Sequence, residues 1–198
     1  QTQAAPSRNF GQIVDEAKSR IIETTMASEF TVLCRLLARI AAGHWPSRDF
    51  TGDRLRAALE LFILEFSVYR TYFAGNSIAD SDRGIITRAI SKARERWYGS
   101  DIAIFDFLQD VLTLDLIASN RAGYSASRVK RFVAQLQQFT GPVTAKAVEE
   151  TAFYRYHRLL ALNEVGKDPS LPPLAGAGFH TAQPTHAHQA PHAKTQPP

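Results

Sequence analysis

The chain has 198 residues, of which 44% are hydrophobic and 21% are charged, a balance typical of a soluble globular domain. Its 23 basic and 19 acidic residues are interspersed and leave a formal charge of +4, too small and too mixed to indicate a nucleic-acid-binding protein. No apolar run approaches the roughly 18 residues that a membrane span needs. The single cysteine cannot form an intramolecular disulfide. We therefore expect a cytoplasmic protein with no membrane partner.

The first helical region covers residues 10–42. Its apolar residues step by three and four, which predicts either one long helix or two helices with a break near Ala27 and Ser28. Gly43 and Pro46 are expected to end this region. The apolar positions on the expected buried face include Ile13, Ile21, Phe30, Leu33, Leu37 and Ile40.

Four further helices are predicted between residues 51 and 139, each beginning beside a side chain that can accept from free N–H groups. Almost nothing in this part of the sequence alternates with the period of two that a strand requires. The predicted fold class is therefore mainly α. In chain order, the residues expected at the helix starts are Thr51 or Asp53, Asp80 or Ser81, Asp101, and Ser125 or Ser127.

The pattern changes after residue 140. Gly141 and Pro142 are predicted to break the helix, and a short element at residues 143–147 is expected to lead into a segment from 148 to 160. Residues 169–198 are rich in proline and histidine and poor in large apolar residues, so we expect this tail to be disordered. Its histidines have no cysteine, carboxylate or rigid scaffold beside them, and no metal site is predicted.

Two blocks of sequence carry a resemblance to a known family. One runs from Gln137 to Asp168 (QQFTGPVTAKAVEETAFYRYHRLLALNEVGKD), and the other, from Ser47 to Phe73, holds SRDFT followed by FSVYRTYF. In the same order and at similar spacing, they resemble segments of malto-oligosyltrehalose synthase, an enzyme of the alpha-amylase superfamily. The resemblance extends from about Asn9 to about Phe179. The departures from the family's usual residues are Ala147 for Gly, Glu150 for Asp and His157 for Asn.

The resemblance implies an internal fragment of an isomerase in trehalose biosynthesis. Such an enzyme converts the reducing-end α-1,4 bond of a maltooligosaccharide into an α,α-1,1 bond by intramolecular transfer, without a metal or organic cofactor. Residues 1–139 would be a helical subdomain inserted in a (β/α)8-barrel glycosidase, and residues 140–168 would return to the catalytic barrel. The family's catalytic carboxylates would lie outside this chain. We therefore expect no catalytic residue here and no turnover by the chain alone.

The same resemblance implies a substrate site near the return to the barrel. Lys146 and Glu149 are three residues apart, so on a helix they share a face and could bracket sugar hydroxyls with charge-assisted hydrogen bonds. Tyr156 could stack on a pyranose ring while Arg155 orients a carboxylate. The alternatives are a solvated ion pair at Lys146 and Glu149 and a core position for Tyr156.

A second hypothesis comes from another class of protein. Five basic residues could line one face of the helix predicted after residue 80, and the chain would then be a free-standing basic helical module that binds a partner helix or nucleic acid without catalysis. An ordinary solvated helix face explains the same pattern. The basic residues are Arg83, Arg88, Lys92, Arg94 and Arg96.

Overall fold

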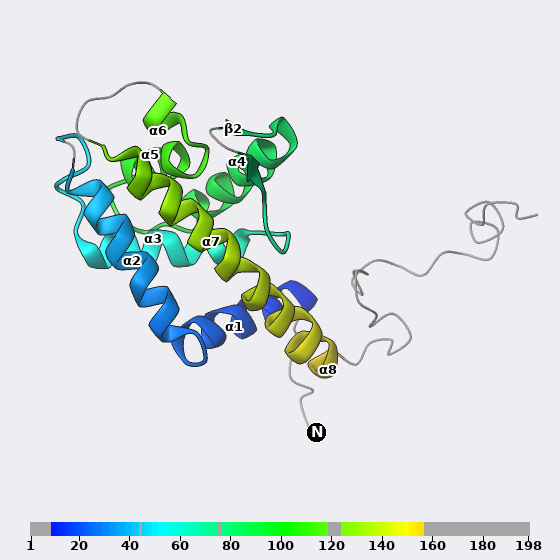
Figure 1. The fold of residues 1–198 in the computed structure, drawn as a ribbon. Helices are drawn as coiled ribbons and strands as arrows, with labels where there is room; N and C mark the ends of the chain where they lie inside the picture. Colours follow the sequence, from blue (N-terminus) through cyan, green and yellow to red (C-terminus); the bar gives the residue numbers. More distant parts are fainter. Residues whose placement is uncertain (1–8, 44, 75–76, 119–123, 157–198) are drawn as a thin grey trace, which may run out of the picture.

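The structure is a computed structural model that describes residues 9–43, 45–74, 77–118 and 124–156. These residues form a mainly helical fold, as the sequence predicts, in which the only described strands are two residues long each (Figure 1). In chain order, the elements are α1 (Phe10–Glu23), α2 (Ala27–Ala41), α3 (Gly52–Glu65), β1 (Phe73–Ala74), β2 (Ser77–Ile78), α4 (Asp80–Glu95), α5 (Ala103–Leu112), α6 (Asp115–Ala118), α7 (Ala126–Ala147), the π-helix η1 (Val148–Ala152) and α8 (Phe153–Arg155).

Side-chain caps account for the starts of α1, α3 and α7, whereas α2, α4 and α5 begin without one. The side chains of Thr51 and Ser125 each accept a hydrogen bond from the backbone N–H three residues ahead, at the starts of α3 and α7. α1 begins with a capping box, in which Asn9 Oδ1 accepts from the N–H of Gln12 at 2.8 Å and Gln12 Oε1 accepts from the N–H of Asn9 at 3.1 Å. The region from residue 10 to residue 42 is two helices, and the break falls at residues 24–26.

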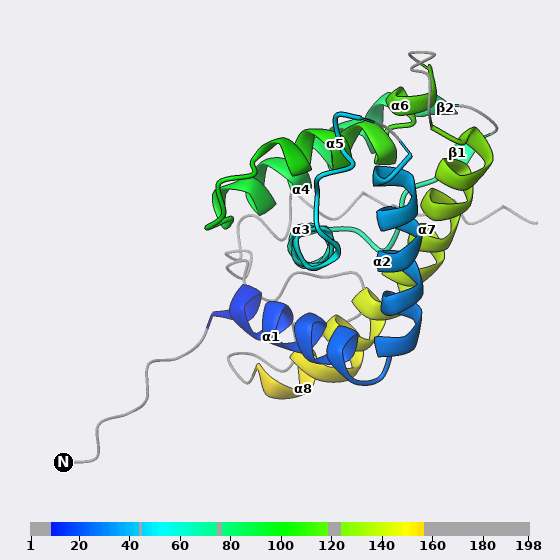
Figure 2. The same cartoon turned by 90° about the vertical axis from the view of Figure 1, so that its left-hand side faces the viewer.

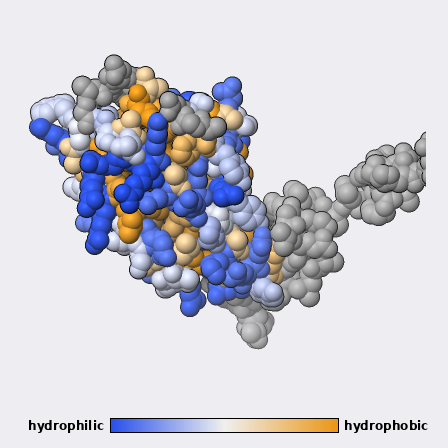
Figure 3. All heavy atoms as spheres, viewed as in Figure 1, coloured by the Kyte–Doolittle hydropathy of each residue, from blue (hydrophilic) through white to orange (hydrophobic). Residues whose placement is uncertain are grey.

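α3 lies in the middle of the bundle. Figure 2 looks nearly along its axis, with α4 and α5 above it, α1 below it and the paired α2 and α7 beside it. Its buried residues recur every three or four positions, so they form one apolar stripe that holds many of the least exposed side chains of the core. On the outer face drawn in Figure 3, hydrophilic side chains predominate, with apolar groups visible between them. The fully buried large side chains include Phe30, Leu55, Leu59, Phe62, Phe105, Leu108 and Phe132.

The predicted helix break at Gly141 and Pro142 is wrong. α7 runs through both residues for 22 residues in all, because buried side chains on each side of the proline keep the helix packed. A proline inside a helix costs about 3 kcal/mol through the lost N–H and the clash of its ring. Phe139, Val143 and Ala147 are all buried in the core, and their burial outweighs that cost.

Replacing Pro142 by alanine is expected to stabilise the chain by about 1 kcal/mol or more, because the side chain is exposed and only the helix penalty is removed. Urea unfolding followed by circular dichroism measures the change. Gly141→Ala is the matched comparison: its new Cβ would lie 3.9 Å from the carbonyl oxygen of Tyr69, an ordinary contact, so it should add only the helix propensity of alanine. Loss of stability in Pro142→Ala would mean that the proline is required by its surroundings.

The expected domain boundary between residues 139 and 140 falls inside α7. The described residues after it, 140–156, continue as helix and pack against α1. The division into residues 1–139, 140–168 and 169–198 stays a prediction. Residues 157–198, including His157 and the expected disordered tail, lie outside the described residues.

Candidate functional site

A π-helical turn, η1, interrupts the helix at the place where the resemblance locates the substrate site. Thr151 Oγ1 donates to the carbonyl oxygen of Lys146 at 2.9 Å, a contact that spans five residues. π-turns inside helices are rare and frequently occur at functional sites. Among the four predicted site residues, Glu149 lies within η1, Lys146 lies just before it, and Arg155 and Tyr156 follow it. The candidate site is therefore built around an irregular helical turn.

Glu149 is held by a residue from a distant part of the sequence. The hydroxyl of Tyr69 donates to Glu149 Oε1 at 2.5 Å across 80 positions of chain. This hydrogen bond, together with partial burial, raises the pKa of Tyr69 above its ordinary value, because it favours the protonated phenol. Tyr69 remains 40% exposed, so the pair is open to solvent and to a ligand.

The Tyr69–Glu149 contact joins the two blocks of sequence that carry the family resemblance. Tyr69 belongs to the earlier block, FSVYRTYF, and Glu149 to the later one. α7 also passes close to the backbone of Tyr69 at Gly141. The sequence places these blocks at similar spacing to the family but contains no local signal that pairs these two residues. The folded chain brings them together on one surface.

Lys146 makes an ion pair with Glu150 instead of Glu149. Its Nζ lies 3.3 Å from Glu150 Oε2, with the two side chains 40% and 64% exposed. Such a solvated pair contributes little to stability, so its geometry can change when a ligand binds. Glu150, where the family usually has Asp, thus keeps a carboxylate beside Lys146 on a side chain one methylene longer. Ala147, where the family usually has Gly, is fully buried in the main core.

Arg155 and Tyr156 lie in different environments. Arg155 is exposed at the end of α8. Tyr156 is only 9% exposed and packs edge-on against Phe10 at 5.4 Å between ring centroids, in a small core cluster with Ile13 and Ala152. The packing of Tyr156 explains how α8 is attached to α1. Its predicted role as a sugar platform stays a prediction.

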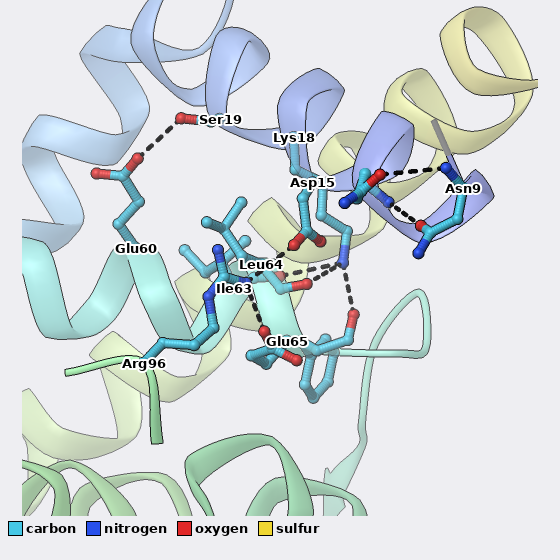
Figure 4. Close-up of polar contacts among 11 residues, drawn as sticks. Asn9, Asp15, Lys18, Ser19, Glu60, Ile63, Leu64, Glu65 and Arg96 are labelled. Carbon is cyan, nitrogen blue, oxygen red and sulfur yellow. Dashed lines mark hydrogen bonds and ion pairs between the residues drawn. The ribbon is translucent and has the colours of Figure 1, made fainter. Parts of the chain in front are cut away.

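Sequence reasoning missed a buried lysine that supports the site. Figure 4 shows Lys18, on α1, reaching the C-terminal end of α3, where its Nζ donates to the carbonyl oxygens of Ile63 at 3.1 Å, Leu64 at 3.1 Å and Phe66 at 2.7 Å. α3 has no basic residue in its own last turn, so Lys18 satisfies the carbonyls left free there. Burial lowers the pKa of Lys18 to about 8. The sequence gives only a weak signal that Lys18 is buried: it follows Ala17, which belongs to the apolar face of the helix.

An ion-pair cluster lies beside Lys18. Arg96 Nη1 lies 2.9 Å from Asp15 Oδ2 and 2.5 Å from Glu65 Oε1, which joins α1, the end of α3 and the end of α4 (Figure 4). The contacts of Lys18 and Arg96 hold α3 at the point where the chain turns toward Tyr69. The cluster therefore positions the segment that carries Tyr69 without facing the candidate site itself.

The basic face proposed for α4 is largely paired with acidic residues. Arg83 contacts Asp115, Arg94 contacts Asp106, and Arg96 contacts Asp15 and Glu65. These carboxylates compensate the charges that a phosphate backbone would need. The observation weighs against the basic-module hypothesis.

Other chemistry finds little support in the part of the chain that the structure describes. Cys34 is half-buried, and its burial raises the pKa of the thiol to about 11, so it is not a ready nucleophile. In residues 9–156, outside the gaps in the description, there is no cluster of three or more His, Cys, Asp or Glu side chains that could hold a metal ion. The same residues include no helix long and apolar enough to cross a membrane.

The fold and site define a helical module that presents a charged π-helical turn. In comparisons with known proteins, the chain is 30% identical over 171 residues to proteins named "Putative maltooligosyl trehalose synthase" from two strains of Mycobacterium tuberculosis, CDC 1551 / Oshkosh and ATCC 25618 / H37Rv. The alignments cover 86% of this chain and 19% of each relative. The chain is thus related to one segment of a much larger protein. No family model matches it, and no solved structure matches it significantly.

Proposed function

We propose that the chain is the helical segment of a malto-oligosyltrehalose synthase and supplies part of the sugar site at the reducing end of the substrate. The observation that carries the proposal is the Tyr69–Glu149 contact, because it joins the two sequence blocks that resemble the family. The similarity to the mycobacterial proteins supports the same family. The reaction would be an isomerisation in cytoplasmic trehalose biosynthesis, in which an α-1,4-glucan end becomes an α,α-1,1-linked trehalose unit.

The groups around η1 suit a neutral sugar. Lys146 can donate to hydroxyl groups, the carboxylate of Glu149 can accept from them, and the hydroxyl of Tyr69 holds that carboxylate in place. A retaining transfer needs a carboxylate nucleophile and a carboxylic acid about 5 Å apart. By the resemblance, those groups belong to the rest of the enzyme. The role proposed for this chain is to hold the reducing-end glucose in position while the bond is remade.

Replacing Lys146 by alanine is expected to weaken maltooligosaccharide binding about tenfold, because one charge-assisted donor is removed from an exposed site. Isothermal titration of the 198-residue chain with maltohexaose measures the affinity. Glu149→Gln, which keeps the shape but removes the negative charge, should weaken binding to a similar extent.

The matched control is Lys92→Ala, which removes an exposed lysine from α4. Its affinity should equal that of the unaltered chain. Equal affinities for the unaltered chain and Lys146→Ala, or no saturable binding by the unaltered chain, would contradict the proposed site. In either case the isolated chain is expected to produce no non-reducing isomer, since the catalytic carboxylates are assigned to other parts of the parent enzyme.

A further inference from the structure

A second surface, away from η1, has the composition of a small-molecule site. A groove of about 480 Å³ lies between α3 and residues 96–99, which follow the last turn of α4. Its lining combines apolar side chains of α3 with the polar groups of Arg54, Glu60, Arg96, Trp97 and Tyr98. Ligand pockets of about this volume usually combine an apolar lining with a few placed polar groups. Neither the resemblance nor the comparisons assign a role to it.

The aromatic residues of the groove are arranged in an unusual way. Tyr98 is 103% exposed, so its ring packs against no other part of the protein and both faces are open to a ligand. Trp97 packs edge-on against Phe105 at 5.4 Å, which fixes the indole ring beside the groove. Its Nε1 is buried and has no hydrogen-bond partner among the described residues. A buried N–H of this kind costs about 1–3 kcal/mol unless a water or ligand accepts from it.

Gly99 keeps the donors of the groove close together. A Cβ at this position would overlap Arg54 Nη1 and come within 2.6 Å of Trp97 Nε1. Gly99 therefore packs directly against Trp97 Nε1 and leaves Arg54, whose side chain is 43% exposed, as the accessible donor. Arg54 also lies over the Trp97 ring at 5.7 Å, so its guanidinium is held near the indole.

Both arginines of the groove are paired with carboxylates, which indicates the class of ligand. Arg54 has Asp101 at 3.7 Å, and Arg96 is compensated by Asp15 and Glu65. No excess positive charge is left to hold an anion. The carboxylate of Glu60, which accepts from Ser19 at 3.1 Å, adds an acceptor to the donors. Donors and acceptors without excess positive charge, beside an exposed aromatic ring, fit a polyhydroxylated neutral molecule.

We propose that the groove between α3 and residues 96–99 binds a neutral oligosaccharide, with Tyr98 stacking on a sugar ring while Arg54 donates to its hydroxyl groups and Glu60 accepts from them. That the oligosaccharide is an α-1,4-glucan rests on the proposed function. The groove would then bind a more distant part of the glucan whose reducing end lies at η1, or it would bind a separate glucan molecule.

The chain allows the groove to be observed separately from the η1 site. It contains two tryptophans, and Trp45→Phe removes the exposed one, so Trp97 becomes the only fluorescent indole. Titration of this variant with maltohexaose is expected to shift the Trp97 emission with saturation. Adding Tyr98→Ala should weaken the apparent affinity about tenfold, and circular dichroism should show an unchanged fold because Tyr98 is fully exposed.

Tyr72→Ala is the matched control. Tyr72 is also exposed, and its N–H donates to Asp82 at the other end of α4. The two tyrosines thus flank a helix of 16 residues, which is about 24 Å long. The Trp97 response should be unaffected by Tyr72→Ala. Glu60→Gln, which retains the shape of the groove, should weaken the response without changing stability.

The outcomes separate this proposal from the proposed function. A Trp97 response that survives Glu149→Gln and weakens in Tyr98→Ala supports the groove, whatever happens at Lys146. Binding by calorimetry that is lost in Lys146→Ala while Trp97 stays silent supports the proposed function and overturns the groove. A Trp97 response to inorganic phosphate but not to maltohexaose would also overturn it, because the groove would then be an anion site.

Discussion

Replacing Phe30 by alanine is expected to lower the free energy of unfolding by about 4 kcal/mol, the largest effect predicted for this chain. Phe30 on α2 is fully buried, and its ring stacks on Phe139 of α7 at 5.9 Å between centroids. The guanidinium of Arg56 lies 4.7 Å from the same ring, so α3 contributes to the contact. Truncation would leave a cavity where three helices meet.

Urea unfolding monitored by circular dichroism measures this change. The matched control is Val32→Ala, on the same helix but 46% exposed, for which we expect at most about 0.5 kcal/mol. A loss of less than about 1 kcal/mol in Phe30→Ala would mean that α2 and α7 do not pack through this side chain.

Replacing Lys18 by methionine is expected to cost about 3 kcal/mol, although methionine is apolar and the site is buried. The substitution keeps the unbranched aliphatic stem but removes the ammonium group that donates to three carbonyl oxygens at the end of α3. The carbonyl oxygens of Leu64 and Phe66 would then lose the Lys18 ammonium as their donor, in a region that little water reaches. The destabilisation should also loosen the segment that carries Tyr69, which begins at Phe66.

The pH dependence gives Lys18 a signature that a simple packing defect would lack. Burial lowers its pKa from 10.5 to about 8 in the folded chain. Between these values the unfolded chain binds a proton that the folded chain has released, so the contribution of Lys18 to stability rises with pH. The stability difference between the unaltered chain and Lys18→Met should therefore be smallest near neutral pH and grow between pH 8 and 10.5.

Urea midpoints measured across this pH range test both statements. Lys92→Met is the control, because Lys92 is exposed on α4 and its replacement should change stability little at any pH. A flat stability difference for Lys18→Met across the range would show that Lys18 titrates normally. A difference near zero at pH 7 would show that its hydrogen bonds to α3 contribute nothing.

The mainly α class and the capped starts of α3 and α7 could be predicted from sequence because their causes are local. The predicted start at Asp101 is wrong, because α5 begins at Ala103 without a side-chain cap. Thr51 and Ser125 cap the N–H groups three residues ahead, and the apolar spacing of residues 10–42 reports one buried face wherever the helix packs. The break predicted at Pro142 is wrong for the opposite reason. Its local penalty is real, but Val143 and the other buried residues around it settle the conformation, and burial depends on helices far away in sequence.

The candidate site shows the same division. The two sequence blocks, Ser47 to Phe73 and Gln137 to Asp168, determined the family resemblance and the residues to consider, since both depend only on the order of amino acids. The tertiary structure decided that Glu149 is held by Tyr69, that Lys146 pairs with Glu150 and that Tyr156 is buried. The physical reason is that hydrogen bonding and burial depend on distance in space. Contacts across 80 positions of chain, such as Tyr69 to Glu149, follow from how the helices pack.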